Sequence, residues 1–283
     1  MRKDSDSVFV ILKPVDAPGG YFASRKLKKS VDEKPAEFIR TADGMPFAVL
    51  EIFNGKNGIE WKKVIEKCGR YTSRVIVPKG ISLPENQRIS PFIPSRFLYN
   101  LCLNTALEIL DTVKLPPDSF VLTLCDHEAR FTNELHRLVP LCSSIKVITE
   151  KIEKYIPVCT DILEKTGASV ILRTSFEKSS KRDAVIFCGG EKNELISADI
   201  VFAPDKTVRG KTTVIGSGIV LLEEHKSITG NGIDPVLFAG AVTELCGSRT
   251  YENSVCERID IIRRGGESAF ADLISSLAEN GVQ

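Results

Sequence analysis

The most constraining feature of the chain is an alternation of apolar runs and helical spacing in its second half. Phe120–Leu124 is a short continuous apolar run, and Ile145–Ile148 is a second one. Between the two runs, apolar residues recur at the spacing of one helix face: Phe131, Leu135 and Leu138. Strands joined by a helical crossover pair in parallel. Residues 119–150 therefore predict a strand, a helix and a second, parallel strand.

The same alternation continues toward the C-terminus. Helical spacing over 151–166 ends at Gly167, and short apolar runs suited to strands follow at 169–173, 184–187, 200–202 and 213–222. Asp234 and Pro235 have the residue types of a helix cap and first position, and Gly247 can end that helix. A last amphipathic helix is expected over 267–277. These elements predict an α/β fold with a Rossmann-like, doubly wound parallel sheet.

The first half predicts a smaller α+β domain. Strands are expected at 8–12, 47–53 and 75–77, and helices at 59–68 and 95–113. We predict an N-terminal domain over 1–94, a connecting helix and linker over 95–117, and a Rossmann-like domain with C-terminal helices over 118–283. The basic run Arg25–Lys34 is interpreted as a solvated helix or loop face in preference to a binding patch.

Composition narrows the functional classes. The chain has 42% hydrophobic and 27% charged residues and a net charge of +1, so nothing electrostatic favours nucleic acid or an anionic membrane as a partner. Three histidines argue against a histidine-rich metal site, and we predict no metal. The eight cysteines form no C-x-x-C pair and mostly lie in apolar runs. With no signal-peptide pattern and no run of about 20 apolar residues, we expect a cytoplasmic protein.

The turn after the first strand of the α/β half lacks the residues of a nucleotide site. Dinucleotide-binding folds place glycines there so that the backbone can approach a pyrophosphate. Here the turn Cys125–Arg130 carries a side chain at every position. Asp126 and Glu128 put two carboxylates where an anion would bind, and we expect them to cap the helix themselves. We therefore predict no cofactor, with NAD(P) as the alternative.

Three residues are weak candidates for catalysis. His127 beside Asp126 has the residue types of a general acid–base pair. Adjacent residues at a helix start point in different directions, so we favour a capping and surface role for both. Cys188 follows a predicted strand and is interpreted either as a nucleophile or, preferably, as a buried strand-end cysteine.

Candidate ligand-binding residues follow the other predicted strands. Glu150 can hold a ribose hydroxyl or cap the next helix, and without the glycines we favour capping. The remaining candidates are expected in loops near the strand ends, where they contact a ligand or only serve turn geometry: Gly189, Gly190, Gly216, Gly218, Asn231 and Gly232.

Three motifs resemble the shikimate-dehydrogenase type of Rossmann enzyme over residues 100–250. They are the pair Asn104-Thr105, the segment DIVFAPDKT over 199–207, and GNGIDPVLFAGAVTELCG over 230–247. The resemblance implies an NAD(P)-binding fold. The chain departs from that family at Cys125–Arg130, which stands in place of its glycine-rich turn, and its catalytic lysine–aspartate pair has no assignable counterpart.

The leading hypothesis is a non-catalytic small-molecule-binding or regulatory module derived from a dinucleotide-binding fold. The first alternative is an NAD(P)-dependent oxidoreductase of the shikimate-dehydrogenase type, or another small-molecule enzyme using an interdomain cleft. The second is a structural partner protein with an exposed apolar patch. An Asp126 side chain folded back on the helix favours the binding module, and an open turn favours an enzyme.

Overall fold

The computed structural model describes residues 8–41, 44–84, 88–114, 116–177, 182–187, 198–204, 213–229, 232–247, 256–263 and 272. The chain divides into two compact units. The first unit combines residues 1–97 with 219–257, and the second combines 98–218 with 258–283.

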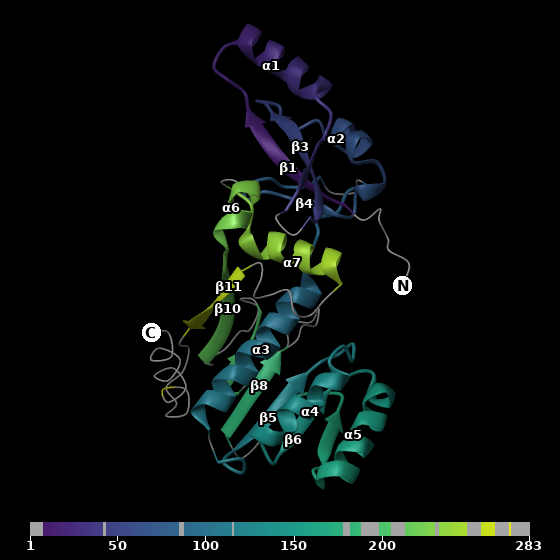
Figure 1. Cartoon of the computed structure of the whole chain (residues 1–283), viewed down its shortest axis with the longest axis vertical. Coiled ribbons are helices and arrows are strands. Elements are labelled where there is room, and N and C mark those ends of the chain that lie inside the picture. Colours follow the sequence, from purple (N-terminus) through teal and green to yellow (C-terminus); the bar gives the residue numbers. More distant parts are fainter. Residues whose placement is uncertain are drawn as a thin grey trace. The chain divides into compact units, whose positions relative to one another are not determined.

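The larger sheet has the strand order of a Rossmann-like fold. Its strands are β5 (Phe120–Cys125), β6 (Ile145–Ile148), β7 (Val170–Arg173), β8 (Arg182–Phe187), β9 (Ile200–Phe202), β10 (Thr213–Leu221) and β11 (Cys256–Arg263). They are ordered β11-β10-β9-β8-β5-β6-β7, and the six strands from β10 to β7 pair in parallel (Figure 1). Numbered from β5, these six follow the order 3-2-1-4-5-6 of dinucleotide-binding sheets. The predicted α/β fold with a parallel sheet is confirmed, whereas β11 was not predicted.

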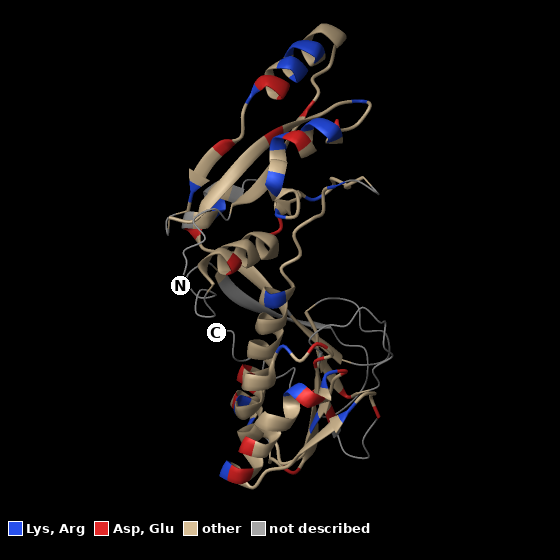
Figure 2. Cartoon of the chain, turned by 90° about the vertical axis from the view of Figure 1, so that its right-hand side faces the viewer, with Lys and Arg blue, Asp and Glu red and all other residues tan. Residues whose placement is uncertain are grey.

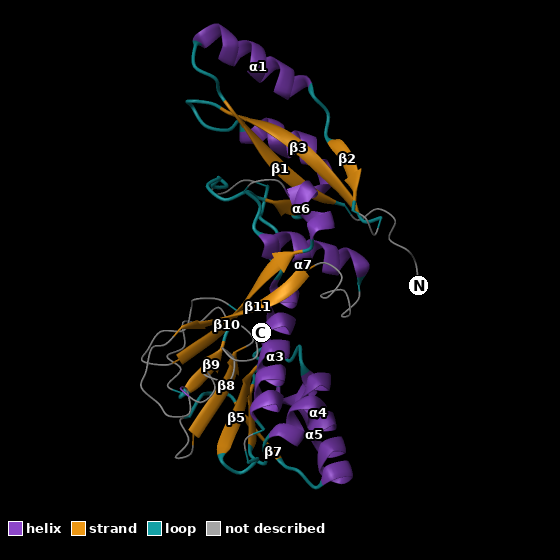
Figure 3. Ribbon diagram, turned by 60° about the vertical axis from the view of Figure 1, so that its left-hand side comes forward, coloured by secondary structure: helices purple, strands orange, loops and turns teal. Residues whose placement is uncertain are grey.

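The apolar runs form strands because both faces of the sheet are covered. Every residue of β5 is buried, and Leu124 pairs with Val147 of β6 and Ile186 of β8. In the second unit, three helices cover one face: α3 (Ser95–Val113), α4 (Leu135–Leu138) and α5 (Ile152–Thr166) (Figure 3). The connections that would cover the other face lie largely outside the described residues, so double winding stays a prediction. Among the described ranges, no helix is both long and apolar enough to cross a bilayer.

The helix expected over 127–139 begins later and is shorter than predicted. A turn follows β5, and helical structure starts with the 3-10 helix η2 (Thr132–Glu134), continues as α4 and ends as η3 (Val139–Leu141). Ala129 has φ 52°, in the left-handed region, so the helix cannot start at residue 127. The final helix expected over 267–277 lies outside the described residues, apart from Asp272.

The first unit contains a four-stranded sheet ordered β2-β3-β1-β4. Strands β1 (Phe9–Asp16), β3 (Pro46–Asn54) and β4 (Val75–Ile76) are parallel, and β2 (Glu37–Arg40) is antiparallel to β3. Helix α1 (Tyr21–Glu33) connects β1 to β2, and α2 (Trp61–Cys68) lies between β3 and β4 in the chain. The strands expected near 8–12, 47–53 and 75–77 are confirmed. The basic run is helical up to Glu33.

Residues 219–247, expected within the Rossmann-like domain, cluster with the first unit instead. Helix α7 (Pro235–Cys246) packs Phe238 on Phe47, with ring centroids 5.1 Å apart. A Cβ on Gly240 would lie 2.2 Å from that of Pro94, so glycine permits this close approach. Local capping was predicted correctly, because the Asp234 side chain accepts from the Val236 N–H at 3.0 Å. The other domain limits stay predictions.

Candidate functional site

The expected site is the edge of the larger sheet where the strand order reverses. That reversal falls between β5 and β8, which pair directly, so that Cys125 lies opposite Phe187. Open α/β sheets bind ligands at such a point, outside the carboxyl ends of the strands. The turn that follows β5 lies at this edge and begins with Asp126.

Asp126 folds back onto the start of the helical segment. Its carboxylate Oδ2 accepts from the Phe131 N–H at 2.8 Å and from the hydroxyl of Tyr155 at 2.6 Å. Asp126 is 1% exposed, and Tyr155, on α5, is also buried. Hydrogen bonds to an ionised acceptor are short and strong. The carboxylate therefore occupies the N–H donor that a helix start would otherwise offer to a phosphate.

The rest of the turn also differs from a glycine-rich phosphate loop. Ala129 has a positive φ where glycine is favoured, and its N–H donates to the Asp126 carbonyl at 3.1 Å. The guanidinium of Arg130 lies over the Tyr99 ring of α3, 5.3 Å from the centroid. Glu128 is exposed. Asp126 and Glu128 were both expected to fold onto the helix. Asp126 does so, by accepting from the Phe131 N–H.

His127 and Glu150 meet through the backbone. The His127 carbonyl accepts from the Glu150 N–H at 3.2 Å and from the Thr149 hydroxyl at 3.4 Å, which joins the turn to the end of β6. The capping role preferred for Glu150 stays a prediction. The residue at the cap of α5 is Lys151, which makes no side-chain capping bond, and its N–H donates to Thr149 Oγ1 at 3.1 Å.

The glycine candidates that the structure describes are divided between the two units. Gly216 and Gly218 were expected in loops, but both lie within β10, directly after Thr213–Ile215, the residues that pair with β9. Gly232 has φ 136° and belongs to the first unit, where its carbonyl accepts from the Lys79 N–H at 2.9 Å. Cys188, Gly189, Gly190 and Asn231 lie outside the described residues.

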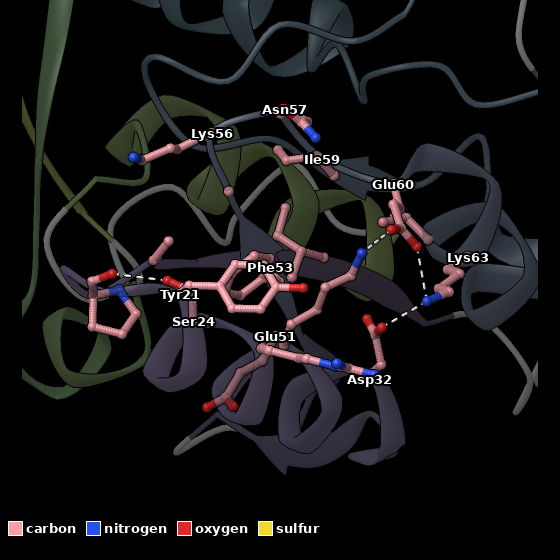
Figure 4. Close-up of a pocket in the computed structure, with 18 of the residues that line it drawn as sticks. Tyr21, Ser24, Asp32, Glu51, Phe53, Lys56, Asn57, Ile59, Glu60 and Lys63 are labelled. Atoms are coloured by element: carbon pink, nitrogen blue, oxygen red, sulfur yellow. Dashed lines mark hydrogen bonds and ion pairs between the residues drawn. The ribbon is translucent and has the colours of Figure 1, made fainter.

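A pocket of about 650 Å³ lies in the first unit, formed by α1, the end of β3 and α2 (Figure 4). Tyr21 and Phe53 supply aromatic rings to it, and Lys56 and Asn57 come from the turn after β3. The volume is in the range of small-molecule sites. Sequence reasoning missed this pocket. The signals were the basic run Arg25–Lys34 and the Asn-Gly turns after β3, but nothing in the sequence shows that these segments converge.

Ion pairs join the two helices beside this pocket, where α1 carries both basic and acidic residues (Figure 2). Glu60 pairs with Lys28 and with Lys63, the latter at 2.8 Å, and Lys63 also contacts Asp32 at 2.6 Å. The pKa of Glu60 is lowered to about 2, mainly by the hydrogen bond from Lys28 and next by the hydrogen bond from Lys63. The pKa of Lys63 is raised, mainly by its hydrogen bond to Asp32 and next by its hydrogen bond to Glu60.

Comparison with known proteins gives no family for the chain. No protein-family profile and no curated protein matches the sequence. Among solved structures, the crystal structure of L-tryptophan dehydrogenase from Nostoc punctiforme aligns with a TM-score of 0.33 and 13% identity, covering 96% of this chain and 79% of that chain. A similarity at this level carries no argument about activity. The Rossmann-like character of the chain rests on its own strand order.

Proposed function

We propose that the chain is a non-catalytic small-molecule-binding or regulatory module, derived from a dinucleotide-binding fold whose nucleotide site is filled by its own carboxylate. The observation that carries this proposal is the buried Asp126 side chain, which accepts from Phe131 and Tyr155. The proposed setting is cytoplasmic, with a small molecule or a protein as the partner and neither nucleic acid nor a membrane involved.

The energetics of the turn support an excluded nucleotide. A pyrophosphate would have to displace the Asp126 carboxylate from two donors, each worth about 1.5–3 kcal/mol when the acceptor is charged. If the carboxylate stayed in place, its charge would repel the phosphate in a buried site where screening is weak. Either route costs binding free energy that a glycine-rich turn does not.

The same contacts weaken an acid–base function for His127. A histidine general base is usually oriented by a carboxylate that accepts from its ring N–H. The nearest carboxylate in sequence, Asp126, turns its Oδ2 toward Phe131 and Tyr155. This argues against catalysis by His127 at the turn.

The strand order favours one competing function, an NAD(P)-dependent oxidoreductase, and a thermal-unfolding titration separates the two. A ligand at 100 times its Kd stabilises a fold by about 2.7 kcal/mol, which is readily seen as a rise in Tm. We expect NAD and NADP to leave the Tm of the full chain unchanged. A saturable rise with either nucleotide would overturn the proposal and mean that Asp126 leaves the turn when the nucleotide binds.

An isosteric variant sharpens the same titration. Asp126→Asn keeps an oxygen acceptor for Phe131 and Tyr155 but removes the negative charge. We expect no nucleotide-dependent rise in this variant either, because the amide still fills the turn. A rise in the variant alone would mean that charge, and not occupation of the donors, excludes the nucleotide.

A further inference from the structure

We propose that the pocket formed by α1, β3 and α2 binds a small organic anion, a carboxylate or phosphate carried on an aromatic body. Arg25 and Lys56 are the cations assigned to the anionic group, and Tyr21 and Phe53 are the rings assigned to the body. This site lies within the first unit and is separate from the turn that contains Asp126.

The charges that line the pocket are unbalanced in favour of an anion. Five basic and three acidic residues line it, a surplus of 5 − 3 = +2: Arg25, Lys28, Lys56, Lys63 and Lys67 against Asp32, Glu51 and Glu60. The whole chain carries only +1, so the surplus is local. A surplus of one sign in a concave site concentrates ligands of the opposite sign.

The acidic side chains are already engaged by lysines. Asp32 and Glu60 share Lys63, and Glu60 also pairs with Lys28. Glu51 pairs with Lys34 at 2.9 Å, and this hydrogen bond lowers the pKa of Glu51. Each of the three carboxylates is therefore paired with a lysine, and none of them is paired with the remaining cations.

The remaining cations are Arg25 on α1 and Lys56 on the turn after β3. Within the described ranges, the side chain of neither residue makes a hydrogen bond or ion pair with another residue. By contrast Lys67, which also lines the pocket, donates to the Val31 and Lys34 carbonyls at 3.1 and 3.0 Å. An arginine presents a planar fork that matches a carboxylate or phosphate, and a lysine adds a point charge.

The aromatic side chains favour an organic anion over an inorganic one. Tyr21 is 73% exposed although it lines the pocket, so a ligand can bury much of its ring. Figure 4 shows Tyr21 and Phe53 in the middle of the view, with the Glu60–Lys63–Asp32 ion pairs on one side. Apolar and aromatic lining with a few placed charges is typical of small-molecule sites. Inorganic phosphate would use the cations and leave the rings exposed.

A titration of the full chain, followed by amide and side-chain NMR shifts, tests this site with defined probes. The anionic probes are phenyl phosphate and benzoate, and the comparators are benzyl alcohol, which lacks the charge, and inorganic phosphate, which lacks the ring. We expect saturable shifts at Gly55, Gly58 and the Arg25 side chain, with a Kd of about 1 mM for the better anion. The comparators should bind about 10-fold more weakly.

The two anionic probes separate a phosphate ligand from a carboxylate ligand by which of them binds more tightly. The absence of saturable shifts at these residues with both probes, at concentrations up to about 10 mM, would overturn the proposal. Equal binding of benzyl alcohol would also overturn it, because the cations would then contribute nothing.

A matched pair of variants shows whether the assigned cations act locally. The double variant Arg25→Gln/Lys56→Gln should raise the Kd of the better anion about 10-fold or more. The control Lys26→Gln/Lys62→Gln also removes two charges, from exposed positions on α1 and α2 that do not line the pocket, and should change the Kd less than about 2-fold. An equal rise in Kd in both variants would mean that the anion responds only to the net charge of the chain, and this would overturn the proposal.

The nucleotide titration remains independent of this result. If the anionic probes do not bind the pocket, the argument that Asp126 excludes a nucleotide is unaffected. If a nucleotide binds at the turn, the proposal for the pocket is unaffected.

Discussion

Two carboxylates in the molecule have similar numbers of partners and very different surroundings. Asp126 accepts from Phe131 and Tyr155 in the turn after β5 and is 1% exposed. Glu60, beside the pocket of the first unit, pairs with Lys28 and Lys63, and its side chain is 47% exposed.

The comparison gives the physical reason for proposing that one region excludes ligands and the other admits them. Removing a partner from a buried carboxylate leaves polar groups without water, which is expensive. Exposed ion pairs contribute little because water replaces a lost partner. A ligand must therefore overcome a firmly held group at the turn, whereas lysine–carboxylate pairs beside the pocket can rearrange at small cost.

The largest effect should come from Asp126→Ala. The substitution leaves the Tyr155 hydroxyl and the Phe131 N–H buried without their acceptor, and we expect the free energy of unfolding to fall by about 2–4 kcal/mol. Urea denaturation followed by far-UV circular dichroism measures it, with Asp126→Asn as the control that retains an acceptor and loses less. If the free energy of unfolding fell no more than it does when an exposed carboxylate such as Glu60 is replaced, the proposed difference between the two carboxylates would be wrong.

Tyr155→Phe should have about half that effect. It removes one donor to Asp126 and keeps the ring packed in the core, so a loss of about 1.5 kcal/mol is expected from the same denaturation experiment. Because the two side chains share one hydrogen bond, the double variant with Asp126→Ala should lose less than the sum of the single losses. Additive losses would mean that the two groups are not coupled.

Local chemistry in the sequence predicted much of the sheet and its helix ends. Apolar runs located β5 and β9 because buried parallel strands need continuous apolar residues. The left-handed Gly167 that ends α5 and the Asp234 cap that begins α7 were predicted because caps depend on one or two residues.

Features made by distant residues could not be predicted in the same way. Tyr155 reaches Asp126 from a separate helix, and Phe238 packs on Phe47 from nearly two hundred residues away in the chain. The pocket joins α1 to the turn after β3, so no single stretch of sequence contains it. The carboxylate at the turn could be predicted from residue type, but its second partner could not.

Ala129→Gly tests whether backbone strain at the turn matters as much as its carboxylate. Ala129 has φ 52°, which costs about 1–2 kcal/mol for a residue with a Cβ, and glycine removes that cost. Glycine also makes the unfolded chain more flexible, which offsets about 0.4–1 kcal/mol. We expect a net gain of about 0.5 kcal/mol in urea denaturation and still no binding of NAD. A nucleotide-dependent rise in Tm would show that glycine alone opens the turn.

The smallest loss of stability should come from Glu60→Gln, and its pH dependence tests the exposed carboxylate of the comparison. The pKa of Glu60 is lowered to about 2 from an ordinary value of 4.5, so in the folded chain the carboxylate stays ionised to lower pH than in the unfolded chain. Its stabilising contribution is therefore complete above about pH 4.5 and is lost as the pH falls toward 2.

Because the side chain is 47% exposed, screening by water limits this contribution to about 0.5 kcal/mol near neutral pH, and added salt should reduce it further. The difference in unfolding free energy between the wild type and Glu60→Gln, measured in urea from pH 7 to pH 2, should shrink across that window, since subtraction removes the titration of groups that the variant shares. A difference as large as that of Asp126→Ala, or one unaffected by salt, would mean that the ion pairs beside the pocket are held as firmly as the turn, and the pocket would then be no easier for a ligand to enter.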